Sequence, residues 1–172
     1  MPQSSAPMAA EEFFREANRY FGYLLVEHGF AVAKRKIADA FDVCEIMLQA
    51  QDWRVRIGRE RGAVYVYIGP ASDPETWFTL GVVITFLQRD RPEGQEIWFG
   101  PRLGWSLDYN VRLELLLQWY AETLRGHAGQ IAALFHEHER ERSLSQLWAW
   151  KEYKDRQAKA ALARGDYPTY HT

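Results

Sequence analysis

Hydrophobic residues recur at helical spacing near the start of the chain. Between residues 9 and 28 they fall three and four positions apart, at Phe13, Phe14, Ala17, Phe21, Leu24 and Leu25. This spacing places them on one face of a helix, and Gly29 suits the left-handed backbone position that follows a helix C-terminus. The pattern predicts an amphipathic helix over residues 9–28. Residues 1–8 are small and polar with two prolines, so we expect them to be disordered.

Strand-like alternation follows this first helix. Residues 30–36 and 43–49 alternate between the two faces of a strand, and so do two segments within residues 53–69. The connections between these segments are short, which predicts an antiparallel meander rather than a set of crossover units.

The stretch WRVRIGRERGAVYVYIG, residues 53–69, determines how two of these strands pair. A turn centred on Arg61-Gly62 places Ile57 opposite Val66. A shift of one residue would scramble the two faces of the strands. The register therefore predicts one buried face, as a one-sided antiparallel sheet requires, formed by Trp53, Val55, Ile57, Val64, Val66 and Ile68 together with Cys44, Ile46 and Leu48.

Helical signals return after the strands. The run S-D-P-E at residues 72–75 matches a capping box, and it also matches an Asp N-cap followed by Pro. We therefore expect a buried helix that begins there and extends to Leu87. An aromatic loop follows over residues 90–107, and a loop of this length is usually packed down or functional.

The C-terminal third of the chain reads as two helices. An apolar stripe predicts a long helix from Asp108, and Ser143 with Gln146 matches a capping box that predicts the start of a last helix. Together the elements predict an α+β fold with an N-terminal helix, a three- to four-stranded antiparallel meander, a buried helix and long C-terminal helices. We expect a single α+β domain over residues 9–138 and a C-terminal helical extension over residues 139–172.

Composition narrows the classes of function. The chain has 172 residues and a formal net charge of −2, which argues against a strongly basic nucleic-acid binder. Cys44 is the only cysteine, so neither an intramolecular disulfide nor a cysteine-based metal cluster can form, as is usual in a reducing cytoplasm. We expect no signal peptide, and the chain has no apolar run of bilayer length. The sequence predicts a cytoplasmic protein with no membrane association.

No motif predicts catalysis. The stretch G-W-S-L-D at residues 104–108 lacks the second glycine of a serine-hydrolase elbow, and Cys44 is expected in the core rather than as a nucleophile. In the run H-E-H-E, helical geometry would point His136 and His138 away from each other, so no metal site is predicted there. We expect a protein that is not an enzyme and that holds no metal and no organic cofactor.

The second face of the predicted sheet carries arginines and tyrosines. Arg54, Arg56, Tyr65 and Tyr67 share this face, with Glu45 on the adjacent strand. Such a face can stabilise itself by stacking arginine on tyrosine, at about 0.5–1 kcal/mol per exposed pair. It also fits a protein-binding surface, because Tyr and Arg are enriched among interface hot spots. A stacking platform for RNA or DNA is the third interpretation, but such RNA-binding sheets interleave helices between their strands.

The last helix offers a second candidate binding surface. One stripe on this helix is predicted to pack on the rest of the protein, and it consists of Leu144, Leu147, Trp148 and Lys151. Trp150 points to the opposite side of the helix, and Tyr153 lies about one turn further on. We expect Trp150 and Tyr153 to form an exposed patch that binds a second copy of the chain or another protein.

Three motifs carry a family resemblance over residues 11–90. They are H-G-F at the end of the first helix, R-x-R-G-x-V-x-V-x-I-G-P in the strands, and W-F-x-L at the buried helix. They resemble small bacterial proteins of unknown function, some of which are similar to immunity proteins of toxin–antitoxin-like competition systems. The resemblance carries over no site residue. It favours a non-catalytic protein-binding module, an immunity or accessory protein that occludes a partner protein. The alternatives are a small enzyme with a site near the 90–107 loop, or an RNA- or DNA-binding accessory protein that uses the Arg/Tyr face.

Overall fold

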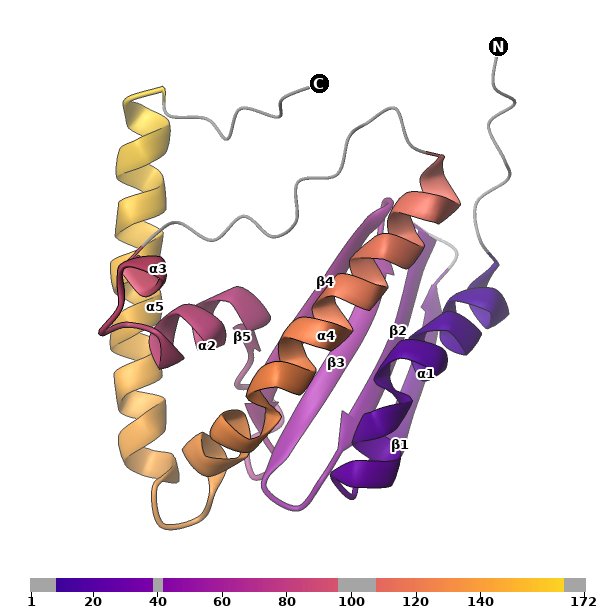
Figure 1. Ribbon diagram of the computed structural model, residues 1–172, viewed down its shortest axis with the longest axis horizontal. Coiled ribbons are helices and arrows are strands. Elements are labelled where there is room, and N and C mark those ends of the chain that lie inside the picture. Colours follow the sequence, from indigo (N-terminus) through magenta and orange to yellow (C-terminus); the bar gives the residue numbers. More distant parts are fainter. Residues whose placement is uncertain (1–8, 39–41, 96–107, 166–172) are drawn as a thin grey trace.

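The computed structural model describes residues 9–38, 42–95 and 108–165, and Figure 1 shows how their helices and strands are arranged. Helices and strands occur in separate runs along the chain, which confirms the predicted α+β class. The predicted disorder of residues 1–8 lies outside the described residues. The elements are α1 (Ala10–Glu27), β1 (Ala31–Ala38), β2 (Val43–Gln49), β3 (Trp53–Glu60), β4 (Ala63–Pro70), β5 (Phe78–Thr79), α2 (Leu80–Leu87), α3 (Pro92–Gln95), α4 (Tyr109–Phe135) and α5 (Arg140–Ala163).

The strands form one antiparallel sheet in the order β1-β2-β3-β4-β5, so the predicted meander is confirmed. The register of β3 and β4 is also the predicted one, with Ile57 opposite Val66 and Arg56 opposite Tyr67. All nine residues assigned to the buried face are buried. The predicted three to four strands are in fact five, because residues 78–79 add a short strand beside β4.

Two turns that glycine makes possible set the ends of these elements. Gly29 follows α1 with a φ of 68°, and the Phe30 N–H beyond it donates to the Leu24 carbonyl at 3.1 Å. Arg61 and Gly62, between β3 and β4, have φ values of 49° and 79°. Positive φ at both central residues suits the twist of the flanking strands. The helix end and the turn position predicted from the sequence are therefore confirmed.

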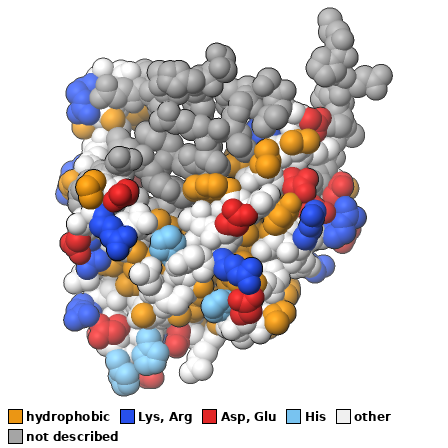
Figure 2. All heavy atoms as spheres, in the orientation of Figure 1, with side chains coloured by type: hydrophobic (Ala, Val, Ile, Leu, Met, Phe, Trp, Pro, Cys, Tyr) orange, Lys and Arg blue, Asp and Glu red, His pale blue; other side chains and the backbone are white. Residues whose placement is uncertain are grey.

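One face of the sheet is covered by α1 and α4, which run side by side across it in Figure 1. Phe13 and Phe21 of α1 and Leu117 of α4 join the inward side chains of the strands in one hydrophobic core. α2 and α5 lie beside the β5 end of the sheet, and Leu147 of α5 belongs to the same core. On the side of the molecule seen in Figure 2, acidic, basic and hydrophobic side chains are interspersed.

The segment before α2 is not the helix that its sequence predicts. The Asp73 carboxylate accepts a hydrogen bond from the Thr76 hydroxyl, which closes a short turn. Phe78 and Thr79 then pair with β4 as β5, and Thr79 caps α2, which begins at Leu80. Strand pairing prevails over the capping signals because it buries the ring of Phe78 completely.

The two predicted C-terminal helices are present, but the second begins earlier than its sequence signal indicates. α4 begins after Asp108, whose side chain accepts hydrogen bonds from the next backbone N–H groups as an N-cap. α5 begins at Arg140 rather than at the predicted cap. Ser143 is buried within the first turn, and its N–H donates to the Glu139 carbonyl at 2.9 Å. The predicted domain boundary at residue 139 stays a prediction.

A buried arginine lies on the core face of the sheet. Arg59 of β3 is buried, and its guanidinium carbon lies 5.5 Å from the ring centre of Phe13. Its Nη2 donates to Asp42 Oδ1 at 2.7 Å, and Asp42 Oδ2 accepts a hydrogen bond from the Tyr109 hydroxyl at 3.0 Å. Arg59 Nε and Nη1 are buried without a hydrogen-bond partner. Asp42 therefore supplies the countercharge for Arg59.

Replacing Val66 with alanine tests the buried face. Val66 is buried in the middle of β4, so we expect Val66→Ala to lower the free energy of unfolding by about 1–3 kcal/mol. Urea denaturation followed by circular dichroism measures this change. Val111→Ala is the control, since Val111 is exposed on α4 and its truncation should change stability by less than about 0.5 kcal/mol. Equal losses in the two variants would show that Val66 is not a core residue.

Candidate functional site

The sheet face opposite α1 and α4 is the candidate site, and we call it the open face. Strand register places its side chains in two rows that cross four strands. One row consists of Lys34, Met47, Arg56 and Tyr67, and the adjacent row of Lys36, Glu45, Gly58 and Tyr65. The two lysines are exposed, and the central side chains are partly exposed. The open face is therefore a mixed aromatic and charged surface that water still reaches.

Arg56 occupies the middle of the open face, between two aromatic rings. Its guanidinium carbon lies 4.9 Å from the ring centre of Tyr67 and 4.6 Å from that of Trp77. Its Nε lies 3.6 Å from Glu45 Oε2, which is beyond hydrogen-bond distance but close enough for an ion pair. Each stacking contact contributes about 0.5–1 kcal/mol. The side chain is thus held in one orientation while 29% of it stays exposed.

Tyr65 anchors the second row. Its hydroxyl donates to Glu45 Oε2 at 2.9 Å across the intervening strand β3. The ring can cross β3 because Gly58, which lies directly opposite Tyr65, has no side chain. Burial of the phenol, and then its hydrogen bond to the Glu45 carboxylate, raise the pKa of Tyr65 well above its usual range. Tyr65 and Tyr67 also contact each other, with ring centres 5.3 Å apart.

Arg54 shares the open face by register but lies beneath the turn that precedes β5. It is buried, its Nε donates to the Pro70 carbonyl at 2.9 Å, and its Nη2 donates to the Asp73 carbonyl. Its guanidinium carbon also lies 4.4 Å from the ring centre of Trp77. Burial lowers the pKa of Arg54 below its ordinary value. Arg54 therefore supports the open face from within the protein and positions Trp77.

Trp77 is a member of the open face that the sequence pattern did not identify. The capping signals placed it inside a helix, whereas in the structure it lies in the turn before β5 and contacts Arg54 and Arg56. Its Nε1–H donates to the Pro74 carbonyl at 3.1 Å, which fixes the plane of the ring. No periodicity signal could have found it, because its position depends on how the turn folds back over β4.

The second predicted surface is arranged differently from expectation. Trp150 is packed against α2, where its Nε1–H donates to Thr85 Oγ1 at 3.1 Å and its ring lies 6.5 Å from that of Phe86. Tyr153 is partly buried beside it, with ring centres 5.2 Å apart. The prediction of an exposed Trp150 is therefore wrong, because α5 is held by α2 as well as by α4. Trp148, which was expected to pack on the rest of the protein, contacts Phe78 with ring centres 4.9 Å apart but stays 43% exposed. Partner binding by Trp150 and Tyr153 stays a prediction.

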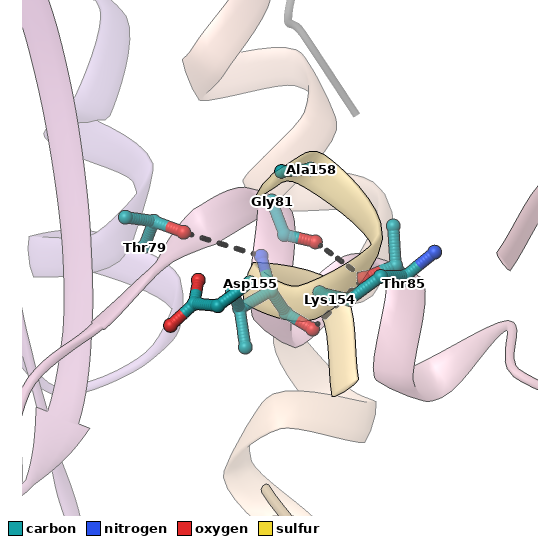
Figure 3. Close-up of a pocket in the computed structure, with 7 residues that line it drawn as sticks. Thr79, Gly81, Thr85, Lys154, Asp155 and Ala158 are labelled. Carbon is teal, nitrogen blue, oxygen red and sulfur yellow. Dashed lines mark hydrogen bonds between the residues drawn. The ribbon is translucent and has the colours of Figure 1, made fainter. Parts of the chain in front are cut away.

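A small pocket opens between α2 and α5, as Figure 3 shows. It has a volume of about 180 Å³, and its polar lining includes Thr79, Thr85, Lys154 and Asp155. Both threonine hydroxyls already bind the backbone of α2, and Asp155 binds Lys151 at 2.7 Å. These contacts lie within α2 and within α5, and a further hydrogen bond, from Trp150 Nε1–H to Thr85 Oγ1, joins the two helices.

The remaining chemical candidates are structural. Cys44 is buried and desolvation raises the pKa of its thiol, which lowers its reactivity. The H-E-H-E segment is a turn between α4 and α5 rather than a helix, and the rings of His136 and His138 lie 5.5 Å apart. The prediction that helical geometry points the two histidines away from each other is therefore wrong. Among the described residues, no group of three or more His, Cys, Asp or Glu side chains could hold a metal ion.

Two further predictions concern location and the aromatic loop. None of the helices within the described ranges is long and apolar enough to cross a membrane. The loop over residues 90–107 contains α3 at its start, and residues 96–107 lie outside the described residues. A catalytic site near that loop stays a prediction.

Comparison with known proteins adds no functional assignment. No family model, no curated protein and no solved structure matches the chain. The resemblance to small bacterial proteins therefore stays a prediction.

Proposed function

We propose that this protein is a non-catalytic protein-binding module and that the open face is its binding surface. The observation that carries this proposal is the position of Arg56, stacked between Tyr67 and Trp77. Its two terminal nitrogens donate no hydrogen bond to the part of the chain that the structure describes. An immunity or accessory protein that occludes its partner requires this kind of prepared surface.

Side-chain entropy favours an arginine that is already oriented before a partner binds. A free arginine loses about 1.5–2 kcal/mol of rotamer freedom when it is fixed at an interface. Arg56 is already oriented by two rings and by Glu45, so much of that cost is met when the chain folds. Its planar fork can bind a partner carboxylate through two parallel hydrogen bonds. A preoriented arginine among aromatic rings is typical of an interface hot spot.

The same geometry disfavours the nucleic-acid alternative. A base would stack on a ring face of Tyr67 or Trp77 that no other group occupies. Each of these rings already has the guanidinium of Arg56 against one of its faces. Tyr65 and Tyr67 are tilted by 57° to each other, so they do not form a parallel platform. The open face therefore favours recognition of a protein surface over stacking of successive bases.

Cross-linking from the open face tests the proposal. A photoreactive phenylalanine analogue is placed at position 67, and the cross-linked partner is identified from the native host and purified. We then expect Arg56→Ala to weaken the partner affinity, measured by calorimetry, at least about 30-fold, which corresponds to a hot spot of about 2 kcal/mol. Arg56→Lys keeps the charge but loses the planar fork, so we expect a loss nearly as large.

Arg142→Ala is the matched control, because Arg142 is an exposed arginine of α5. It should leave the affinity unchanged. Equal affinities of wild type and Arg56→Ala for every cross-linked protein would contradict the proposal. Submicromolar binding of single-stranded RNA at physiological salt, abolished by Tyr67→Ala, would instead establish the nucleic-acid alternative.

A further inference from the structure

β1 is an edge strand with an exposed backbone. It pairs with β2 on one side, and no strand within the described ranges pairs with its other side. Seven of its eight residues are exposed, as the burial pattern of Ala31–Ala38 shows. The strand is irregular between Val32 and Lys34, and its regular part, residues 34–38, offers a row of N–H and C=O groups to another strand.

The side chains of this edge are strongly basic. Lys34, Arg35 and Lys36 follow one another along β1, and β1 carries no acidic residue. Lys34 and Lys36 point toward the open face, because they pair with Met47 and Glu45. Neither lysine has a hydrogen bond or ion pair in the part of the chain that the structure describes. Three cations on a strand of a protein with a net charge of −2 are a local concentration of positive charge.

The other side of the same edge carries two apolar residues, with Arg35 between them over the ring of Phe14. Val32 and Ile37 pair with Leu48 and Cys44, so their side chains point toward the core face. They nevertheless stay 43% and 52% exposed, because they lie at the outer border of the core. A further strand alongside β1 would place its own side chains about 4.5–5.5 Å from these two residues and cover them.

We infer that β1 is the docking edge for an extended acidic segment of the partner protein, which adds to the sheet as a further strand. Acidic side chains of that segment face Lys34 and Lys36, and apolar ones face Val32 and Ile37. This inference rests on the proposed protein-binding function and names the chemistry of the partner. A second copy of β1 does not fit this edge, because it would place lysines and arginines against one another.

A labelled peptide tests the inference directly. The probe is a fluorescein-labelled peptide of four Glu-Val repeats with blocked ends, and fluorescence anisotropy measures its binding to the full chain. We expect a matched Lys-Val peptide to bind at least tenfold more weakly. The variant Lys34→Glu with Lys36→Glu should lower the affinity for the Glu-Val peptide at least tenfold. Lys151→Glu on α5 is the control and should leave the affinity for the Glu-Val peptide unchanged. Thermal melting shows whether the variants remain folded.

Backbone methylation separates strand pairing from simple charge attraction. The Glu-Val peptide is methylated at the backbone nitrogen of every second residue, in two versions that block opposite edges of the strand. One version should lose binding and the other should keep it, because only one edge of the peptide pairs with β1. Equal binding of both versions, or no binding of the unmethylated peptide, would overturn the inference.

The native partner distinguishes the failure of this inference from that of the proposed function. Loss of affinity in both Arg56→Ala and the Lys34→Glu, Lys36→Glu variant is the expected result. If only Arg56→Ala binds weakly, the open face binds protein but the edge of β1 does not, and the inference falls. If neither change weakens binding, the proposed function falls as well.

Discussion

Asp42→Ala is expected to lower the free energy of unfolding by about 3 kcal/mol, because it leaves the charge of Arg59 buried without its countercharge. Only 2% of the Arg59 side chain is exposed, whereas 38% of the Asp42 side chain is exposed. Asp42 can therefore be truncated without leaving a cavity. The loss of stability then comes from the buried, unpaired charge of Arg59. The Tyr109 hydroxyl loses its acceptor at the same time. Urea denaturation followed by tryptophan fluorescence measures the loss.

Two further variants separate the contributions at this ion pair. Asp42 has a φ of 53°, which asparagine tolerates better than alanine, so Asp42→Asn isolates the loss of charge from backbone strain. Arg59→Met replaces the buried cation by an apolar side chain of similar length, and we expect a smaller loss than for Asp42→Ala. If Arg59→Met destabilises the protein more than Asp42→Ala does, the ion pair is not the origin of the effect.

Gly58→Ala is the second substitution with a large expected effect, also about 3 kcal/mol. A β-carbon at Gly58 would overlap the ring of Tyr65, which crosses β3 at this point. The ring must move, so the cost combines overpacking, about 1–3 kcal/mol, with loss of the Tyr65 hydrogen bond to Glu45, about 1 kcal/mol. Chemical denaturation of the purified variant gives the free energy.

A double-mutant cycle identifies the clash as the cause. In a Tyr65→Ala background the space above Gly58 is empty, and Gly58→Ala should then be close to neutral. Gly126→Ala is the matched control, because nothing lies within 4 Å of a β-carbon there, and alanine is about 1 kcal/mol better than glycine within a helix. A similar loss from Gly58→Ala in both backgrounds would show that contact with Tyr65 is not responsible.

Arg59 is a charged residue whose burial could have been predicted from the alternation of residues along β3. It follows Trp53, Val55 and Ile57 at the same spacing, so the register that predicts their burial also assigns Arg59 to the core face. Its charge concealed this assignment, because a lone arginine is rarely buried without a partner. The partner is Asp42, which precedes β2 and comes close only when β2 and β3 pair.

The open face was predicted in part. Alternation placed Arg56, Tyr65 and Tyr67 together on the outer face, and the structure brings these three into contact. It also placed Arg54 there, yet Arg54 is covered by the turn after β4. The same turn brings Trp77 onto the face. Both differences come from one segment, whose local capping signals were strong but did not decide its structure.

The sequence by itself determined the class of fold, the register of β3 and β4, and nine buried residues of the sheet. These properties follow from periodicity, since a period of two or of 3.6 assigns each residue to a face before any tertiary contact forms. Only the tertiary structure decided the fifth strand, the packing of Trp150 against α2, and the stacking of Arg56 between Tyr67 and Trp77. Each of these depends on the burial of a side chain by a segment distant in sequence, and that gain in free energy outweighs local preference.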